Sequence, residues 1–342
     1  MTDIITISER SLHRASDILA AGGLVAFPTE TVYGLGANAC DGKAVAGIFA
    51  AKDRPSFNPL ISHVASRDAA FRLGIETKLA DILARCFWPG PLTLVLNRQP
   101  DCPVALLTTA GLDKIAVRVP ANKHAQRLLQ ICDMPIAAPS ANPSGRISPS
   151  TADHVHAGLA GKIDLILDGG PCEDGLESTI IDCSGAAPVL LRPGGIARAA
   201  IETALQSAGV TVALIDAQTI NKQTSDSQTS DSQTGDPQQP VAPGQLRSHY
   251  APEAGVRLNA TTASATEELI GFGPVAGAGH LAMSFSQTAD LREAATNLFA
   301  MLHQADAVTS GTGRTIAIAP IPDDGIGEAI NDRLRRAAAP RD

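Results

Sequence analysis

The sequence lacks the cysteine and membrane patterns that mark several common protein classes. Its six cysteines include no CxxC pair, and no histidines stand at the spacing of zinc ligands, so neither structural zinc nor a disulfide framework is expected. No uninterrupted apolar run approaches the length of a bilayer-spanning helix. Residues 1–27 also lack the basic-then-apolar order of a signal peptide. We therefore expect a cytoplasmic protein that makes no membrane contact.

Two catalytic signatures and a basic excess are missing as well. The chain has no Walker sequence GxxxxGK[ST], which excludes a P-loop, and no GxSxG elbow of a hydrolase. Residues 1–210 hold 18 basic against 20 acidic side chains, and residues 211–342 hold 9 against 15. Proteins that bind a long nucleic-acid backbone usually carry a basic excess. Extensive nucleic-acid binding is therefore not expected.

The composition that is present belongs to a folded chain with two domains. Hydrophobic residues make up 44% and charged residues 18% of 342 residues, which is enough for two cores. Residues 220–240 contain SDSQT twice in tandem and almost no apolar side chains, so they cannot bury enough surface to offset their ordering entropy. We expect a flexible linker at 213–252 between a domain at 1–212 and a smaller one at 253–342.

The first domain alternates short β-rich runs with helical patterns, which favours an α/β fold around a twisted sheet. A helix is expected at 43–52, because Asp41 can cap it and Val45, Ile48 and Phe49 recur at helical spacing. Further helices are expected at 121–131 and 152–159. The expected strands are 23–27, 115–119, 136–138, 163–168, 179–182 and 189–192.

The second domain shows a strand, a helix and a strand in that order. Residues 280–285 and 315–319 read as strands, and apolar residues between 291 and 302 fall on one helical stripe. This order predicts a small Rossmann-like domain with a parallel sheet.

Several polar residues stand where a ligand could reach them. Lys52 and Arg54 lie close together, with Asn58 four residues further on, and such a cation pair either binds an anion such as phosphate or forms an exposed turn neutralised by Asp53. The segment PSANPSGR offers Ser140 and further hydroxyls, which suit a triphosphate or ribose, or a helix cap followed by a turn.

Three further residues pose a similar choice. Arg118 lies in the apolar run IAVRV, where its burial requires an anion, either a structural carboxylate or that of a substrate. His63 follows the apolar run PLIS and is either a core residue or a ligand contact. Arg192 ends a strand and precedes Pro-Gly-Gly, a turn that lets the backbone approach a ligand.

These residues lie in blocks that resemble the threonylcarbamoyl-AMP synthase family, the YrdC-like enzymes of tRNA modification, in their two-domain form. The blocks are PTETVYGLG (28–36), KDRPSFNPLISH (52–63), WPGPLT (88–93), PIAAPSAN (135–142), ESTII (177–181) and LLRPG (190–194). SHYAP (248–252) resembles the family's linker motif, and GIGEAINDRLRRAA (325–338) resembles the end of its accessory domain.

The resemblance implies a twisted mixed-sheet YrdC-like domain with a central concave pocket, in which L-threonine, bicarbonate and ATP give an adenylate and pyrophosphate. It implies Mg²⁺ carried with ATP, no organic cofactor and no protein metal site. A separate tRNA threonylcarbamoyl transferase complex would use the product, and tRNA contact would be transient at most.

The resemblance also implies a set of site residues, with Lys52 and Arg54 acting in catalysis and Tyr250 closing the pocket as part of a lid. The residues implied to hold threonine are Thr31, His63, Arg118, Ala138 (through its backbone) and Ser178. Those implied to hold ATP are Arg54, Asn58, Lys114, Ser140, Ser148, Arg192 and Tyr250.

Two other functions are compatible with the fold. One is an O-carbamoyltransferase of the same fold, which carries acylphosphatase-like and Cys-rich zinc-finger segments that this chain lacks. The other is a double-stranded RNA-binding or tRNA-binding translation factor, which the absence of a basic excess disfavours.

Overall fold

A large mixed sheet organises the N-terminal part of the chain. The computed structural model describes residues 2–217, 248–274 and 283–340. Eleven strands pair in the order β1-β8-β2-β3-β7-β4-β6-β5-β9-β10-β11. Their bounds are β1 Asp3–Thr6, β2 Val25–Phe27, β3 Gly34–Asn38, β4 Ile61–His63, β5 Leu92–Asn97, β6 Lys114–Arg118, β7 Ile136–Ala137, β8 Leu165–Asp168, β9 Thr179–Asp182, β10 Val189–Arg192 and β11 Ile215–Asp216.

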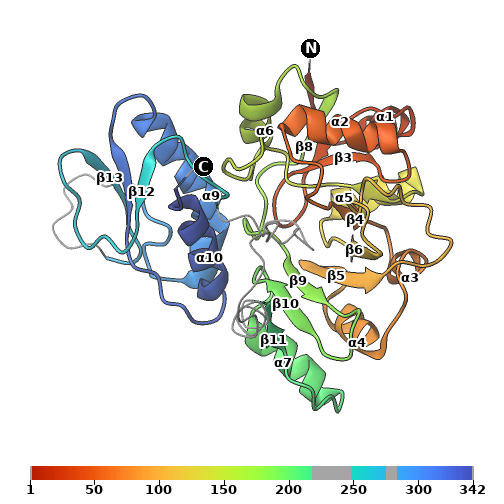
Figure 1. The fold of residues 1–342 in the computed structure, drawn as a ribbon. Coiled ribbons are helices and arrows are strands. Elements are labelled where there is room, and N and C mark those ends of the chain that lie inside the picture. Colours follow the sequence, from red (N-terminus) through yellow and green to blue (C-terminus); the bar gives the residue numbers. More distant parts are fainter. Residues whose placement is uncertain (1, 218–247, 275–282, 341–342) are drawn as a thin grey trace, which may run out of the picture.

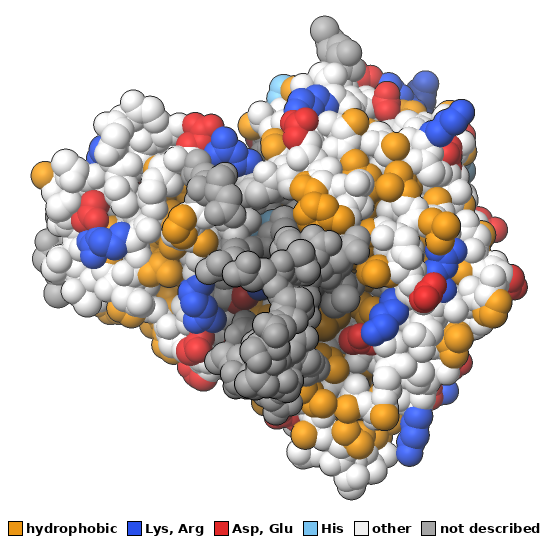
Figure 2. Space-filling model, viewed as in Figure 1, with side chains coloured by type: hydrophobic (Ala, Val, Ile, Leu, Met, Phe, Trp, Pro, Cys, Tyr) orange, Lys and Arg blue, Asp and Glu red, His pale blue; other side chains and the backbone are white. Residues whose placement is uncertain are grey.

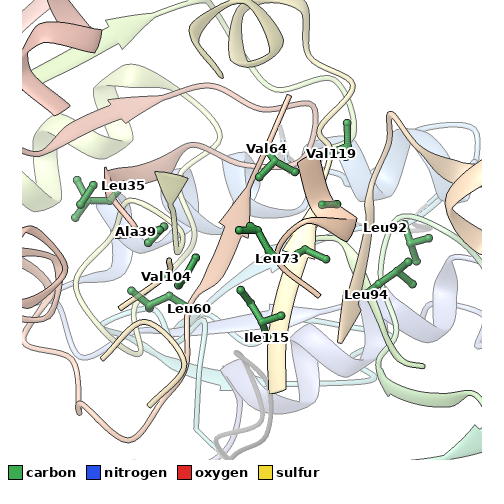
Figure 3. Close-up of a cluster of buried hydrophobic side chains, with 14 of the residues drawn as sticks. Leu35, Ala39, Leu60, Val64, Leu73, Leu92, Leu94, Val104, Ile115 and Val119 are labelled. Carbon is green, nitrogen blue, oxygen red and sulfur yellow. The ribbon is translucent and has the colours of Figure 1, made fainter. Parts of the chain in front are cut away.

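Helices cover this sheet and form its hydrophobic cores. The largest cluster packs residues of α2 and α4 against strands β3, β5 and β6, and Figure 3 shows Leu35, Leu94 and Ile115 within it. A second cluster lies between α1, α5 and strands β2 and β8. The helix bounds are α1 Glu9–Ala20, α2 Gly42–Lys52, α3 Arg67–Phe71, α4 Lys78–Phe87, α5 Lys123–Cys132, α6 Ala152–Leu159 and α7 Arg198–Ser207.

The pleat of β6 separates the main core from a second face of the sheet. Ile115 and Val117 point into the largest cluster, whereas Ala116 belongs to a small cluster with Ile61. Arg118 shares the parity of Ala116 and therefore points the same way. The strand thus presents a cation on the face opposite to the main core.

The C-terminal part folds as a small parallel sheet with two helices. Strands β12 (Gly255–Arg257), β14 (Thr315–Ile318) and β13 (Glu267–Ile270) pair in that order, all parallel. Helices α9 (Leu291–Thr309) and α10 (Gly327–Ala337) lie on the side of this sheet that faces the large domain (Figure 1). The expected parallel α/β architecture is confirmed.

One predicted strand of this domain, at 280–285, is not found in the part of it that the structure describes. Part of 280–285 lies outside the described residues, and its described part makes only an isolated bridge at Ser284. The strand that precedes α9 is β13, whose sequence EELI contains two glutamates. Glu267 and Glu268 form ion pairs with Arg257 and Arg314. Phe285 is buried in the core beside α9 although the described part of its segment is not a strand. Apolar content alone therefore misled the prediction.

The other expectations for local structure hold in most places. Helix α2 begins after Asp41, whose carboxylate accepts from the Lys43 amide, and α6 is capped by Thr151. In the large sheet the predicted strands all occur with small shifts, but β1, β3, β4, β5 and β11 were not predicted, and neither were β12 and β13 of the small sheet. The SDSQT repeats lie outside the described residues.

The lengths of the helices and the surface charges bear on whether a membrane or a nucleic acid could be a partner. None of the helices in the described part of the chain combines the length and apolar content that crossing a bilayer requires. On the face drawn in Figure 2, Lys and Arg side chains are interspersed with Asp and Glu over both domains. That face therefore offers no broad positive field to a nucleic acid.

Candidate active site

One pocket gathers most of the predicted site residues. It opens on the sheet face that carries Ile61 and Arg118, and segments from both ends of the chain reach it. It is lined by Thr31, Val32, Arg54, Ile61, His63, Arg118, Ala138, Pro139, Ser140, Glu177, Ser178, Arg192, His249 and Tyr250.

Nine of the thirteen predicted residues are in that lining, namely Thr31, Arg54, His63, Arg118, Ala138, Ser140, Ser178, Arg192 and Tyr250. The other four, Lys52, Asn58, Lys114 and Ser148, are not in it. Val32, Ile61, Pro139, Glu177 and His249 line the pocket and were not predicted. Two of these residues could have been predicted from the sequence. His249 directly precedes Tyr250 in the motif SHYAP, and Glu177 directly precedes Ser178 in the motif ESTII.

Arg118 is held by a carboxylate of the protein itself. Its Nη2 donates to Glu30 at 2.6 Å and its Nη1 donates to the Thr31 hydroxyl at 3.0 Å, and all three side chains are buried. Burial alone would raise the pKa of Glu30, but the Arg118 charge and hydrogen bonds lower it overall. Of the two anions considered for Arg118, the structural carboxylate is present as Glu30, and contact with a substrate carboxylate stays a prediction.

His63 is both a buried residue and a pocket residue. Its Nδ1 lies 3.3 Å from the Ile61 carbonyl oxygen and its ring meets Phe27 edge-on. Burial, reinforced by the neighbouring Arg118 charge, lowers its pKa to about 3. The imidazole is therefore neutral near pH 7 and offers Nε2 without adding positive charge.

Lys52 and Arg54 form a buried cation pair that donates to backbone oxygens. Lys52 Nζ donates to the carbonyls of Ser140 and Asn142, and Arg54 donates to those of Asn58 and Pro59. Neither cation forms an ion pair with any described residue. Burial, and then the Arg54 charge, holds the pKa of Lys52 well below its usual range, and burial lowers that of Arg54 to about 10.

The alternative of an exposed, self-neutralised turn at this place is wrong. Asp53 adopts a left-handed conformation with φ of 52° and pairs with Lys162 at 3.1 Å instead of with its neighbours. Asn58 is fully buried, and its amide nitrogen and oxygen have no hydrogen-bond partner. Because unsatisfied buried amides are rare in folded proteins, the Asn58 side chain is suited to a polar ligand or a bound water.

Arg192 and Ser178 meet where two strands approach the pocket. Arg192 Nη2 donates to the Ser178 carbonyl at 2.9 Å and to its hydroxyl at 3.2 Å, and that hydroxyl also lies 2.8 Å from the Thr93 hydroxyl. Gly194 follows in the turn, where an added Cβ would come 2.4 Å from the Glu177 carbonyl oxygen. Only glycine permits this approach, which keeps Arg192 against the pocket.

The remaining predicted residues lie at varying distance from the ligand space. The Ser148 hydroxyl is buried and donates to Glu177 at 2.6 Å. Lys114 Nζ pairs with Asp182 at 2.8 Å and is partly exposed. The Ala138 amide donates to the Ile61 carbonyl at 3.0 Å, so any backbone contact with a ligand has to use the Ala138 carbonyl.

The motif SHYAP returns to the pocket from the far side of the linker. Tyr250 is 1% exposed, has a φ of 63°, and stacks on Phe299 of α9 with ring centroids 5.6 Å apart. The Ala251 amide donates to the Gly145 carbonyl at 2.8 Å. His249 is buried beside the Tyr250 ring, and its Nδ1 makes no hydrogen bond. Two aromatic side chains of this motif therefore form one wall of the pocket.

No group of three or more His, Cys, Asp or Glu side chains within the described ranges could hold a metal ion. Glu177 is the acid among the lining residues, and its two oxygens already accept from Ser148 and Arg333. The same lining contains Arg54, Arg118 and Arg192, and these cations suit an anionic ligand.

Comparison with known proteins agrees with this arrangement. A Sua5/YciO/YrdC family model described as "Telomere recombination" matches residues 17–194, and a model described as "Threonylcarbamoyl-AMP synthase, C-terminal domain" matches residues 196–339. The threonylcarbamoyl-AMP synthase of Pyrococcus abyssi is 39% identical, covering 100% of this chain and 99% of its own length. That of Bacillus subtilis is 37% identical, covering 100% and 96%.

A solved structure has the same fold over nearly the whole chain. The crystal structure of P. abyssi Sua5 complexed with L-threonine superposes with a TM-score of 0.82 at 38% identity, covering 98% of each chain. The match includes both the large mixed sheet and the small parallel one. The chain belongs to the threonylcarbamoyl-AMP synthase family.

Proposed function

We propose that this protein forms threonylcarbamoyl-AMP and pyrophosphate from L-threonine, bicarbonate and ATP. The observation that carries the proposal is the convergence of Arg54, Arg118 and Arg192 on one pocket with a neutral histidine and several hydroxyls. Glu30 balances Arg118, but the lining still gathers more buried cations than anions, and a triphosphate and an amino-acid carboxylate are anions that suit it. The named relatives add independent support.

The half of the pocket around Arg118 suits threonine. Glu30 fixes the Arg118 guanidinium, so its remaining donors are preorganised for the carboxylate of the amino acid. The Thr31 and Ser178 hydroxyls and the neutral His63 supply short-range polar contacts, and the Ala138 carbonyl is an acceptor for the amine. A site built to hydrogen-bond a hydroxyl discriminates strongly against analogues that lack it.

The half around Arg54 suits the phosphates of ATP. Arg54 and Lys52 have backbone oxygens as their hydrogen-bond partners, and Arg192 lies across the pocket beside Ser178. Ser140 and Tyr250 border the same space, and the Asn58 amide lies behind Arg54. We also propose that Lys114 and Ser148 contact ATP. Neither lines the pocket, so the bound nucleotide would have to extend beyond the lining to reach them.

Two bond-forming steps account for the product. The threonine amine attacks bicarbonate, giving a carbamate and water. A carbamate oxygen then attacks the α-phosphorus of ATP, the bond to the β-phosphate oxygen breaks, and pyrophosphate leaves. Arg54, Arg192 and Lys52 offset the growing negative charge, so catalysis consists mainly of positioning and electrostatic stabilisation.

Magnesium fits this scheme as a companion of ATP. The donors around the pocket are cations and hydroxyls, with Glu177 already engaged, so the described residues offer no carboxylate cage. When bound to the phosphates, Mg²⁺ supplies further charge neutralisation. We propose no organic cofactor and no resident metal.

The product is a reactive mixed anhydride and has to pass to a second enzyme. We propose that a tRNA threonylcarbamoyl transferase complex accepts it in the cytoplasm, and that this chain contacts tRNA at most transiently. The interspersed charges of Figure 2 are compatible with that role.

The test is pyrophosphate release from ATP with purified full-length protein. Release should require both L-threonine and bicarbonate, and L-serine, which keeps the hydroxyl but lacks the methyl group, should support it at least about tenfold less. Pyrophosphate release that ignores threonine, or its complete absence while ATP binds, would rule out the proposed reaction.

A further inference from the structure

An arginine of the accessory domain lies at the centre of a buried network beside the pocket. Arg333 of α10 is 0% exposed. Its Nε donates to Glu177 at 2.9 Å, and its Nη1 donates to Asp332 at 2.8 Å and to the Pro193 carbonyl at 2.9 Å. The Tyr250 ring lies beneath the guanidinium, with its centroid 5.4 Å from Cζ, which is within the range of a cation–π contact.

The partners of Arg333 outside its own helix all belong to pocket segments. Glu177 and Tyr250 line the pocket, and Pro193 directly follows Arg192. Glu177 and Pro193 lie 156 and 140 residues before Arg333 in the chain, so only the docking of the two domains brings them to it, whereas Tyr250 packs with the core of the accessory domain. The proposed reaction uses neither Arg333 nor the motif GIGEAINDRLRRAA around it.

In this network Asp332 is shared by two arginines, and Glu177 is placed to receive the charge of Arg333. Asp332 is paired with Arg336 at 3.0 Å as well as with Arg333, so the charge of Arg333 is available to Glu177. Glu177 also acts on Arg192, whose pKa is lowered by burial and raised in part by that carboxylate. Without Arg333, the charge of the buried Glu177 would act on Arg192 without that compensation.

We propose that Arg333 is a positioning residue of the active site. It holds Glu177 by one oxygen and supports the Tyr250 ring, so that the charge of Arg192 remains directed at the phosphates of the ligand. The accessory domain thereby completes the ATP half of the pocket and leaves the threonine half unaffected. The identity of the ligand as ATP rests on the proposed function.

A purely structural role makes a different prediction, and the chain offers a matched control. Glu328 also lies on α10 and joins the same two domains through Arg198 of α7 at 2.7 Å. Neither residue lines the pocket. If Arg333 only docks the domains, Glu328→Gln should reproduce the effect of Arg333→Met.

The experiment measures equilibrium binding of ATP and of L-threonine separately, by calorimetric titration of full-length protein. Arg333→Met should weaken ATP binding about tenfold or more, because it exposes Arg192 to an unbalanced buried carboxylate. Threonine affinity should change less than about twofold. Adding Glu177→Gln to Arg333→Met should restore most of the ATP affinity, because the amide carries no charge. Glu328→Gln should leave both affinities near the wild-type values.

A conservative variant keeps the proposal testable if Arg333→Met does not yield folded protein. Lysine retains the charge but cannot reach Glu177 and Pro193 with one planar fork. Arg333→Lys should therefore weaken ATP binding by at least about threefold, again without affecting threonine. Thermal unfolding of each variant confirms that folded protein is being compared.

Three results would overturn the proposal: equal losses for ATP and threonine, an equal loss in Glu328→Gln, or no recovery in the double variant. Wild-type protein that binds ATP but releases no pyrophosphate would refute the proposed reaction. The role of Arg333 in ATP binding could still be judged from the measured affinities. Wild-type protein that binds no ATP would overturn both.

Discussion

The two halves of the pocket hold their arginines in different ways. In the threonine half, Arg118 pairs with the buried Glu30 at 2.6 Å. In the ATP half, Arg54 and Lys52 donate to backbone carbonyls and form no ion pair among the described residues. One half is therefore close to electroneutral before any ligand arrives, and the other carries net positive charge inside the protein.

This difference separates stability from function. A buried ion pair gains little net free energy, but breaking it leaves one charge without a partner. Cations held by carbonyl dipoles destabilise the unliganded protein, and an anionic ligand relieves that destabilisation on binding. We expect the Arg118 half to control folding stability and the Arg54 half to control ligand affinity and turnover.

The strongest test of this difference is Arg54→Ala. It removes a charge that offsets the developing negative charge on the phosphates, so turnover should fall about 10³-fold or more. The unfolding free energy of the unliganded protein should stay the same or rise, because repulsion with Lys52 is relieved. Steady-state pyrophosphate release and urea unfolding provide the two measurements.

Arg146→Ala is the matched control for that prediction. Arg146 lies in the pocket-bordering segment PSANPSGR, but it is partly exposed, does not line the pocket and pairs with Glu253 at 3.4 Å. It should retain near-normal turnover. Arg54→Ala protein that keeps a tenth of wild-type activity would contradict the assignment of the phosphate half.

The next test concerns Arg118 in the threonine half, where we expect a large loss of folding stability. Arg118→Ala leaves Glu30 buried without its cation and should lower the unfolding free energy by about 3–5 kcal/mol. The double variant Arg118→Ala/Glu30→Gln should recover a large part of that loss, since the unpaired charge is gone. Urea unfolding of the two variants decides the matter, and equal instability of both would show that packing rather than charge dominates.

The sequence predicted which residues surround the pocket better than how their charges are balanced. Arg118 was identified because a cation in an apolar run is costly to bury without an anion, Arg54 because it stands beside Lys52, and Arg192 because a Pro-Gly-Gly turn follows it. The partner of Arg118 is Glu30, 88 residues earlier in the chain, and the two meet only when the motif at 28–36 folds against β6. Local periodicity has no information about such a contact.

The same limit explains two other gaps. Strands β3 and β4 have five and three residues and lie inside the motif blocks, where glycine and proline mask any alternation of apolar residues. Arg333 sits in a helix rich in arginines, and only the docked structure distinguishes it from Arg335, which is exposed. Burial separates these neighbours, and burial is a property of the assembled domains.

Acidification should affect the threonine half through His63. Its pKa in the folded protein is about 3, below the value near 6.5 of an unfolded histidine. The unfolded chain therefore binds more protons below pH 6.5, and stability present above that pH is lost progressively as the pH falls toward 3. Between pH 7 and 5 the His63 contribution should fall by about 2 kcal/mol.

His63→Gln tests this pH dependence by removing the titrating group. The variant should lose less unfolding free energy between pH 7 and 5 than wild type does, as measured by urea unfolding at each pH. His13→Gln, at an exposed position of α1, serves as the control and should follow the wild-type curve. An unchanged slope in His63→Gln would mean that other buried groups account for the acid sensitivity.

The smallest effect is expected at Lys114, and its size shows how far the ATP-binding half extends along β6. Lys114 pairs with Asp182 at 2.8 Å, is partly exposed and does not line the pocket. The proposed contact of Lys114 with ATP should be weak, because a partly exposed cation that already has an ion-pair partner gains only about 1 kcal/mol or less from a further anion. Lys114→Ala should therefore raise the KM for ATP by less than about fivefold. A much larger rise in KM, with normal thermal stability, would mean that ATP extends along β6 toward Lys114. The positively charged half would then reach beyond the lining, and the proposed ATP contact of Lys114 would be supported.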